Sequence, residues 1–191
     1  MVRSKIGFLL AAFTVAALSI APASAARKTF FIDPYGARTS NGAGRNIDTG
    51  GLAGISLPDN STPDLGFGFM IPKGYKRNSP IRILFNWQTA DTSCGIVFQP
   101  EFVDRSRPGH APTTPPDAGG LVAEDGSTVL NAPAVASQGN LKVFTLGPAQ
   151  GFDQQSGDAI LLAFVRDSAA LSDTCADDLI ISGITIEYQT P

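Results

Sequence analysis

Apolar and polar residues alternate along several short stretches of this chain, most clearly around residues 81–87. In Ile81–Trp87 the odd-numbered positions are isoleucine, isoleucine, phenylalanine and tryptophan, and the positions between them are arginine, leucine and asparagine. A period of two places these two sets on opposite faces of a half-buried β-strand. Similar apolar stretches bounded by turn residues predict further strands. We expect strands at Lys28–Asp33, Gly54–Leu57, Gly66–Ile71, Ile81–Trp87, Gly95–Asp104, Ser127–Leu130, Asn140–Gly147, Ala159–Arg166 and Leu179–Gln189.

Two of the expected strands contain a residue that interrupts a regular ladder. Pro100 lies inside Gly95–Asp104, and because proline has no N–H to donate, it predicts an edge position or a β-bulge. Gly183 lies inside Leu179–Gln189 and predicts a bulge or a close approach of another backbone. Beyond Gly183 the alternation predicts an inward face formed by Ile184, Ile186 and Tyr188.

The pattern predicts very little helix. The 20 glycines and 14 prolines interrupt every candidate with a 3.6-residue period, so we expect helix only as single turns near Ala149–Ser156 or Ser168–Asp173. Seven to nine strands separated by turn signals predict an all-β fold, an antiparallel β-sandwich. The chain from Tyr35 to Gly54 is expected to be a long surface loop. Long crossing loops such as 105–126 favour a jelly-roll-like sandwich over an immunoglobulin fold.

The first 25 residues have the composition of a signal peptide. Arg3 and Lys5 precede the uncharged apolar run Ile6–Ile20, and Ala23-Ser24-Ala25 follows as a cleavage site of small residues. The run has fifteen residues, fewer than the about 20 that a membrane-spanning helix needs. We therefore expect cleavage after Ala25 and a secreted or periplasmic product that does not span a membrane. The expected remainder is one β-sandwich domain over 26–191, with a loop-rich N-terminal segment at 26–65 and its core at 66–191.

The chain has two cysteines, Cys94 and Cys175. Export to an oxidising compartment favours a disulfide bond between them. Such a bond would bring the start of the strand at Gly95 beside the loop that precedes Leu179. The alternative is a pair of reactive or metal-binding thiols, although neither cysteine lies in a Cys-x-x-Cys motif. The disulfide would also gather four carboxylates into one acidic rim, those of Asp91, Asp173, Asp177 and Asp178.

Charge narrows the classes of partner and cofactor. The chain has 14 Lys and Arg against 17 Asp and Glu, a formal net charge of −3, which argues against nucleic acid as a partner. Calcium takes six to eight oxygen ligands, often from acidic loops, so the acidic residues around Cys175 are calcium candidates. A solvated acidic loop held by the disulfide is the alternative, and no other cofactor is indicated. These calcium candidates are Asp167, Asp173, Asp177 and Asp178.

Few residues are placed for catalysis. His110 is the single histidine and lies in a proline-rich loop, and the sequence shows neither the nucleophile nor the orienting partner that a catalytic histidine needs. Glycoside hydrolysis needs two carboxylates across a cleft, and nothing in the sequence pairs Glu101, Glu124 and Glu187. We therefore expect a protein that is not an enzyme.

Three aromatic residues are candidates for ligand binding, because a flat ring can stack on a sugar face while polar groups orient the ligand. Tyr35 lies in a loop, Tyr75 lies in a turn that follows Pro72, and Trp87 ends a strand. The alternative for Trp87 is a core position, since it continues the inward face of its strand. The alternative for Tyr75 is packing across the end of the sandwich.

The order of these motifs resembles a known all-β module. Residues 66–75 are rich in phenylalanine and end in Pro-Lys-Gly-Tyr, residues 157–167 run from Gly-Asp to Arg-Asp, and residues 179–188 end in Ile-Glu-Tyr. Together with the strand at residues 81–87, they resemble the jelly-roll-like module of phage virion and tail-associated proteins and of uncharacterised secreted bacterial proteins. The resemblance covers residues 66–189 and implies the fold, and it brings no catalytic residues with it.

These observations predict a secreted, non-enzymatic β-sandwich with a structural or surface-interaction role. Its expected partner is an unidentified protein or glycan. A small carbohydrate-binding module is the alternative. The signal peptide and the two cysteines distinguish this chain from virion members of the module and favour a secreted bacterial protein.

Overall fold

The computed structural model describes residues 26–46, 53–106, 121–124, 128–147 and 154–191. These residues form twelve β-strands and one turn of 3-10 helix, η1 (Pro34–Gly36). The strands are β1 (Arg27–Ile32), β2 (Arg38–Ser40), β3 (Gly44–Asn46), β4 (Gly54–Leu57), β5 (Asp64–Met70), β6 (Ile81–Gln88), β7 (Gly95–Ser106), β8 (Leu121–Ala123), β9 (Val129–Asn131), β10 (Asn140–Leu146), β11 (Ala159–Arg166) and β12 (Leu179–Gln189).

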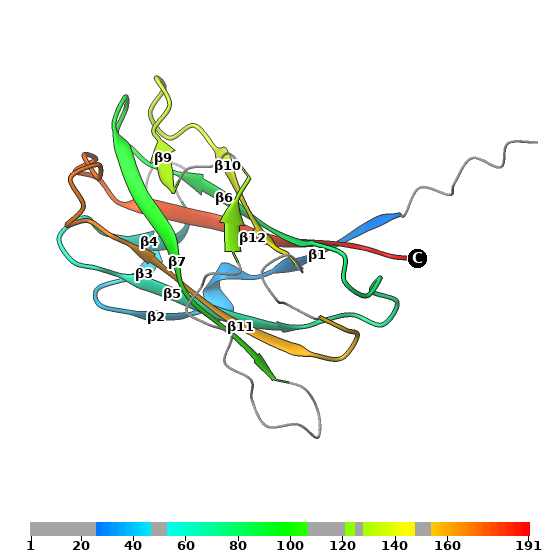
Figure 1. Cartoon of the computed structure of the whole chain (residues 1–191). Helices are drawn as coiled ribbons and strands as arrows, with labels where there is room; N and C mark the ends of the chain where they lie inside the picture. Colours follow the sequence, from blue (N-terminus) through cyan, green and yellow to red (C-terminus); the bar gives the residue numbers. More distant parts are fainter. Residues whose placement is uncertain (1–25, 47–52, 107–120, 125–127, 148–153) are drawn as a thin grey trace, which may run out of the picture.

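The strands form two antiparallel sheets that pack as two layers (Figure 1). The seven-stranded sheet has the order β3-β4-β12-β6-β10-β8, with β1 also paired to β12. The five-stranded sheet has the order β2-β5-β11-β7-β9. Because all the described pairings are antiparallel and each sheet buries one face, the predicted all-β antiparallel sandwich is confirmed.

The order of the strands is that of a jelly roll. From β4 to β12, each successive strand lies in the opposite sheet from the strand before it, so every connection in this part crosses between layers. As a result, each sheet contains four of these strands as consecutive neighbours, in the order β4-β12-β6-β10 in one sheet and β5-β11-β7-β9 in the other. Eight strands arranged in two such sheets define the double-sheet jelly roll. The jelly-roll-like prediction is therefore confirmed.

Phenylalanine rings from both sheets form the centre of the core. Phe85 of β6 contacts Phe164 of β11 with ring centroids 4.7 Å apart, and Phe98 and Phe144 pack against both. All four rings are fully buried, and burial of one such side chain contributes about 1.5–3 kcal/mol. The alternation seen in the sequence produces this core, because the odd positions of β6 and the even positions of β10 point inward.

Both predicted interruptions are β-bulges. Along β11, Ala163 pairs with Phe102 and Phe164 pairs with Pro100, so Glu101 is an extra residue in β7. Along β12, Ile181 pairs with Trp87 and the next register pair is Gly183 with Asn86. The extra residue in each strand increases the local twist and can redirect a side chain.

The structure corrects three details of the secondary structure. The loop expected at 35–54 contains η1, β2 and β3, and η1 begins where the Asp33 carboxylate accepts the N–H of Tyr35. The turn expected at Ser168–Asp173 is not helical but consists of two tight turns. The strand β8 lies inside the loop expected at 105–126. Strands of three residues are too short for a two-residue period to show in sequence.

Several expectations concern parts of the chain outside the described residues. The signal peptide at 1–25, His110 and most of Ala149–Ser156 belong to these parts. Among the described residues, no helix has the length and apolar character needed to cross a membrane. The strands β1, β2 and β4 of the N-terminal segment pair with β12 or β5 of the expected core.

Candidate functional site

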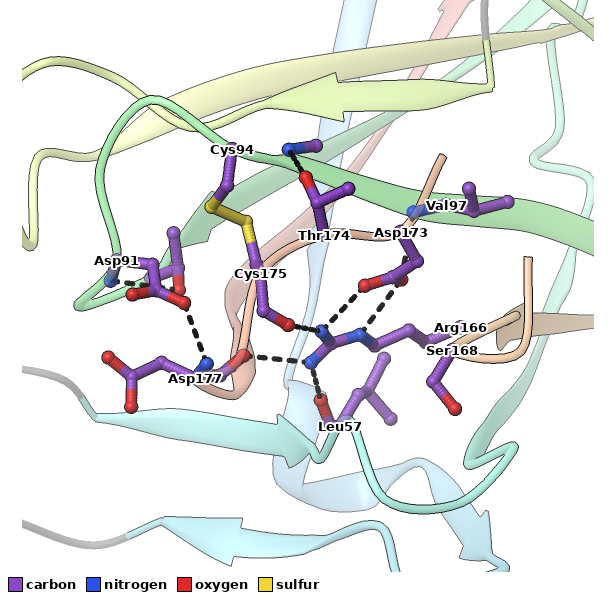
Figure 2. Close-up of polar contacts among 12 residues, drawn as sticks. Leu57, Asp91, Cys94, Val97, Arg166, Ser168, Asp173, Thr174, Cys175 and Asp177 are labelled. Atoms are coloured by element: carbon purple, nitrogen blue, oxygen red, sulfur yellow. Dashed lines mark hydrogen bonds and ion pairs between the residues drawn. A yellow bond between two sulfur atoms is a disulfide. The ribbon is translucent and has the colours of Figure 1, made fainter. Parts of the chain in front are cut away.

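The two cysteines form a disulfide bond at one end of the sandwich. Cys94 directly precedes β7 and Cys175 lies in the loop between β11 and β12, and their Cα atoms are 5.2 Å apart. Figure 2 shows the bond beside the loop that leads into β12. The predicted pairing and the predicted meeting of these two segments are confirmed. Reactive or metal-binding thiols are thereby excluded at these positions.

A fully buried arginine lies next to the disulfide (Figure 2). Arg166 donates to both carboxylate oxygens of Asp173, at 3.1 and 2.9 Å. It also donates to the backbone carbonyls of Leu57, Cys175 and Asp177, at 2.7–3.0 Å. The ion-pair partner of Arg166 is thus Asp173, and the adjacent Asp167 forms no ion pair with it in the described structure. The guanidinium ties β4, β11 and the loop before β12 together.

Two of the four aspartates proposed for calcium, Asp173 and Asp178, already accept hydrogen bonds from the protein. Asp173 binds Arg166 and the N–H of Val97, Asp91 accepts the N–H of Asp177, and Asp178 accepts the Ser56 hydroxyl. A calcium ion needs six to eight oxygen ligands, and no set of three or more carboxylates comes together among the described residues. The interpretation of the loop as an acidic rim held by the disulfide fits this geometry better than calcium binding.

One group of metal-ligand type comes together in the described residues, Asp91 with the two cysteines. Both sulfur atoms of that group are consumed by the disulfide bond. The group therefore offers one carboxylate rather than a set of ligands.

The aromatic candidates from the sequence do not form a ligand surface. Trp87 is 3% exposed and Tyr75 is 6% exposed, so neither presents a ring face to solvent. The Tyr75 hydroxyl donates to the Ser79 carbonyl, in agreement with packing across the end of the sandwich. Tyr35 is half-buried against the core. Among the described residues, Phe31 of β1 is an exposed aromatic ring, at 62% exposure.

Two glutamates that showed no pairing in sequence meet on one arginine. Arg82 of β6 donates to both carboxylate oxygens of Glu124, at 2.8 and 2.9 Å, and to Glu187 of β12 at 2.5 Å. Arg27 of β1 adds a second ion pair to Glu187 at 3.0 Å. The expectation that nothing pairs these carboxylates was wrong, because the register of β12, β6 and β10 brings together residues far apart in sequence. Glu101 lies apart from them, on the five-stranded sheet.

A polar hollow of about 220 Å³ lies over this network. Its lining combines the two arginines and two glutamates with Pro80, Thr145, Tyr188 and Gln189. The hydrogen bonds to Glu124 and then to Glu187 raise the pKa of Arg82 above its ordinary value. The hydrogen bond from Arg82 lowers the pKa of Glu124 below its ordinary value of 4.5. A general acid at neutral pH needs the opposite shift, so Glu124 serves here as a fixed negative charge.

Apolar side chains flank this charged network on the outer face of the seven-stranded sheet. Residues that pair across neighbouring strands form rows on this face. Phe31 pairs with Thr185, and Thr185 pairs with Leu84. Their row lies next to the row that contains Glu187 and Arg82. Val122 continues the row of Arg82, and Leu141 lies one row beyond Leu84. We call this set the outer-face patch: Phe31, Arg82, Leu84, Val122, Glu124, Leu141 and Glu187.

No protein-family model matches the chain, and the search of curated proteins found no match. Among solved structures, the chain is similar to the enzymatically active domain of bacteriophage CBA120 tailspike protein 4, with a TM-score of 0.31 and 10% identity. The similarity covers 86% of this chain and 19% of the tailspike chain. At this TM-score it assigns no substrate, residue or partner to the present chain.

The comparison corrects one prediction from the sequence. We expected a protein that is not an enzyme, and the tailspike domain found in the comparison is described as enzymatically active. The prediction of a non-enzymatic protein is therefore contradicted.

Proposed function

We propose that this chain is an exported jelly-roll module that binds a partner protein through the outer-face patch of its seven-stranded sheet. The observation that carries the proposal is the exposed Phe31, which lies beside a charged network centred on Arg82. Aromatic residues and arginine are enriched where proteins meet, and apolar side chains within a polar rim are typical of such surfaces.

The charges of the outer-face patch support a protein partner. Arg82 is held on two sides by Glu124 and Glu187, so its guanidinium does not have to be ordered when a partner binds. The positive and negative groups are adjacent, which favours a partner with a matching pattern over a uniformly charged polymer. Val122 and Leu141 extend the apolar area on the far side of the network.

Two features support export to an oxidising compartment. Residues 1–25 have the charge, apolar run and small-residue site of a signal peptide. The disulfide bond between Cys94 and Cys175 is of the kind that persists outside the cytosol. We propose that the processed chain is secreted or periplasmic and that residues 26–191 are its folded module.

Carbohydrate binding is a second candidate function. The observation that favours it is not one of the aromatic rings expected from the sequence. It is a depression on the opposite, five-stranded sheet that is lined by polar and small residues.

Site-specific photo-crosslinking in the native cell tests the proposed interface. The photoreactive residue p-benzoylphenylalanine is placed at position 31, and in a matched control at position 171, where Leu171 is fully exposed in the loop between β11 and β12. We expect a discrete crosslinked product from position 31 that disappears in the additional variant Arg82→Glu. An unchanged product in Arg82→Glu, the same product from position 171, or no product from position 31 would overturn the proposal.

A further inference from the structure

A second depression, of about 420 Å³, lies on the outer face of the five-stranded sheet. Its lining is polar or small: Arg38, Thr39, Ser40, Asp64, Gly66, Glu101 and Ala163. Its volume is within the range of about 300–1,000 Å³ that is typical of small-molecule sites. We propose that this depression binds a hydroxyl-rich carbohydrate, independently of the outer-face patch on the other sheet.

Gly66 forms part of the floor of the depression, and the fold does not require a glycine there. A Cβ at this position would meet its nearest atoms, in Leu162 and Arg38, at 3.7–3.9 Å, which are ordinary contact distances. Its backbone does not occupy the left-handed region that favours glycine. A glycine inside a strand often marks a bulge, a tight bend or a place where a ligand or another backbone approaches closely. The register of β5 is regular at Gly66 on both sides, which leaves close approach as the explanation.

Gly68, two residues further along β5, provides the contrast. A Cβ there would lie 2.6 Å from the Leu161 side chain and 3.1 Å from the Ile160 carbonyl. The close Ile160 carbonyl and the Leu161 side chain therefore leave little room for a side chain at Gly68. Both glycines face outward, yet only the space above Gly66 is left open, next to the small side chain of Ala163.

Two charged side chains, those of Arg38 and Glu101, lie at opposite ends of the floor of the depression. Strand register places Arg38 beside Gly66 and Gly66 beside Ala163, and the bulge in β7 places Glu101 next along the same row. Three strand spacings separate β2 from β7, or about 14 Å. Within the described part of the chain, the side chains of Arg38 and Glu101 make no hydrogen bond or ion pair, whereas the Asp64 carboxylate accepts the Ser40 hydroxyl.

This arrangement suits sugar hydroxyls, because each hydroxyl both donates and accepts. The carboxylates of Glu101 and Asp64 accept from a hydroxyl, and the guanidinium of Arg38 donates to one. Two carboxylates against one arginine disfavour sulfated or phosphorylated polymers.

A peptide fits the same depression less well. The floor strands β5 and β11 are each paired on both sides, so a peptide cannot join the sheet there as an additional strand. The described residues that line the depression also include no large apolar side chain.

Glycan binding by the exported, oxidised protein tests the site. An array of neutral, amino-sugar, uronate and sulfated glycans identifies the best ligand, and calorimetry measures its affinity for each variant. We expect Gly66→Leu, which fills the depression, and Glu101→Gln each to weaken binding at least about tenfold, a loss of about 1.4 kcal/mol. The matched controls are Gly139→Leu, at a glycine with open space around it, and Lys73→Ala, both with unchanged affinity.

The possible results separate this proposal from the proposed function. Glycan binding that Gly66→Leu abolishes and Arg82→Glu leaves intact supports the site on the five-stranded sheet. Binding that survives Gly66→Leu, binding confined to sulfated glycans, or no binding to any glycan at millimolar concentration overturns it. Binding of peptides in place of glycans overturns it as well. A failed crosslink at position 31 has no bearing on these measurements, because the two sites lie on opposite sheets.

Discussion

Arg166 and Asp173 form a buried, bidentate ion pair, with 0% and 2% of their side chains exposed. They lie seven residues apart, at the end of β11 and in the loop before β12. A buried ion pair of this kind adds little to stability by itself, but removing one partner leaves an unpaired charge in the core. The pair therefore serves to fix the path of the loop that carries Cys175.

The first prediction concerns this pair. Arg166→Met and Asp173→Asn should each lower the free energy of unfolding by about 3–5 kcal/mol. Arg166→Met should be the more severe, because it also removes the donors to the carbonyls of Leu57, Cys175 and Asp177. Urea denaturation followed by fluorescence measures both. Asp167→Asn, at the neighbouring carboxylate, is the control and should change stability by less than about 0.5 kcal/mol.

The second prediction concerns the disulfide bond. Cys94→Ser should lower the free energy of unfolding by roughly 4.5 kcal/mol, the chain-entropy value for a loop of this length, since the cysteines lie 81 residues apart. Thermal unfolding of the exported protein, with and without reductant, measures the loss. Wild-type protein under reductant should approach the variant, whereas the variant itself should not respond. Two free thiols in the exported wild-type protein would contradict the prediction.

The sequence predicted the strands well wherever they are long and central. The bounds expected for β4, β11 and β12 agree with the structure, and those of β6 differ by one residue. These strands have an alternating or continuous apolar pattern, because they pack on the core along their whole length. The short strands β2, β3 and β8 escaped detection, since three residues cannot display a period and their pairing depends on neighbours distant in sequence.

The candidate sites were harder to predict, because both depend on strand register. Glu124 and Glu187 lie 42 and 105 residues from Arg82, and no local pattern indicates that three strands bring them together. Arg166 follows an apolar run. Nothing in that run indicates that the end of β4 and the loop before β12 would bury its side chain. The pairing of Cys94 with Cys175 could be predicted, because the chain has only two cysteines.

The third prediction uses the lowered pKa of Glu124. Its carboxylate should titrate below 4.5 in the wild-type protein, and Arg82→Met should return the midpoint toward 4.5, because the hydrogen bond from Arg82 is the main cause of the shift. NMR of the carboxyl carbon against pH measures both. Thr145→Val, which removes a smaller contribution, should raise the midpoint less. An unchanged midpoint in Arg82→Met would refute the assigned cause.

The same shift gives a direction for stability against pH. A carboxyl whose pKa is lower in the folded state contributes stability above its unfolded pKa, and this contribution is lost as pH falls through the folded value. The contribution of Glu124 is therefore complete above about pH 4.5 and disappears in more acidic solution. Wild-type protein and Glu124→Gln should differ in stability at pH 7 and converge as the pH falls below the folded pKa of Glu124.

The fourth prediction compares two strand glycines. Gly66→Ala should raise the free energy of unfolding by about 0.5–1 kcal/mol, because alanine loses less backbone entropy than glycine and its Cβ meets only ordinary contacts. Gly95→Ala should lower it by about 1–3 kcal/mol, since its Cβ would lie 2.7 Å from the Ser172 carbonyl oxygen. Thermal denaturation of both variants shows whether each substitution stabilises or destabilises the fold.

A stabilising Gly66→Ala would mean that the fold gains nothing from this glycine. The open floor of the depression would then be retained at a cost in stability, as expected of a binding site. A destabilising Gly66→Ala would show instead that the glycine serves packing, and would remove the main structural argument for a ligand there.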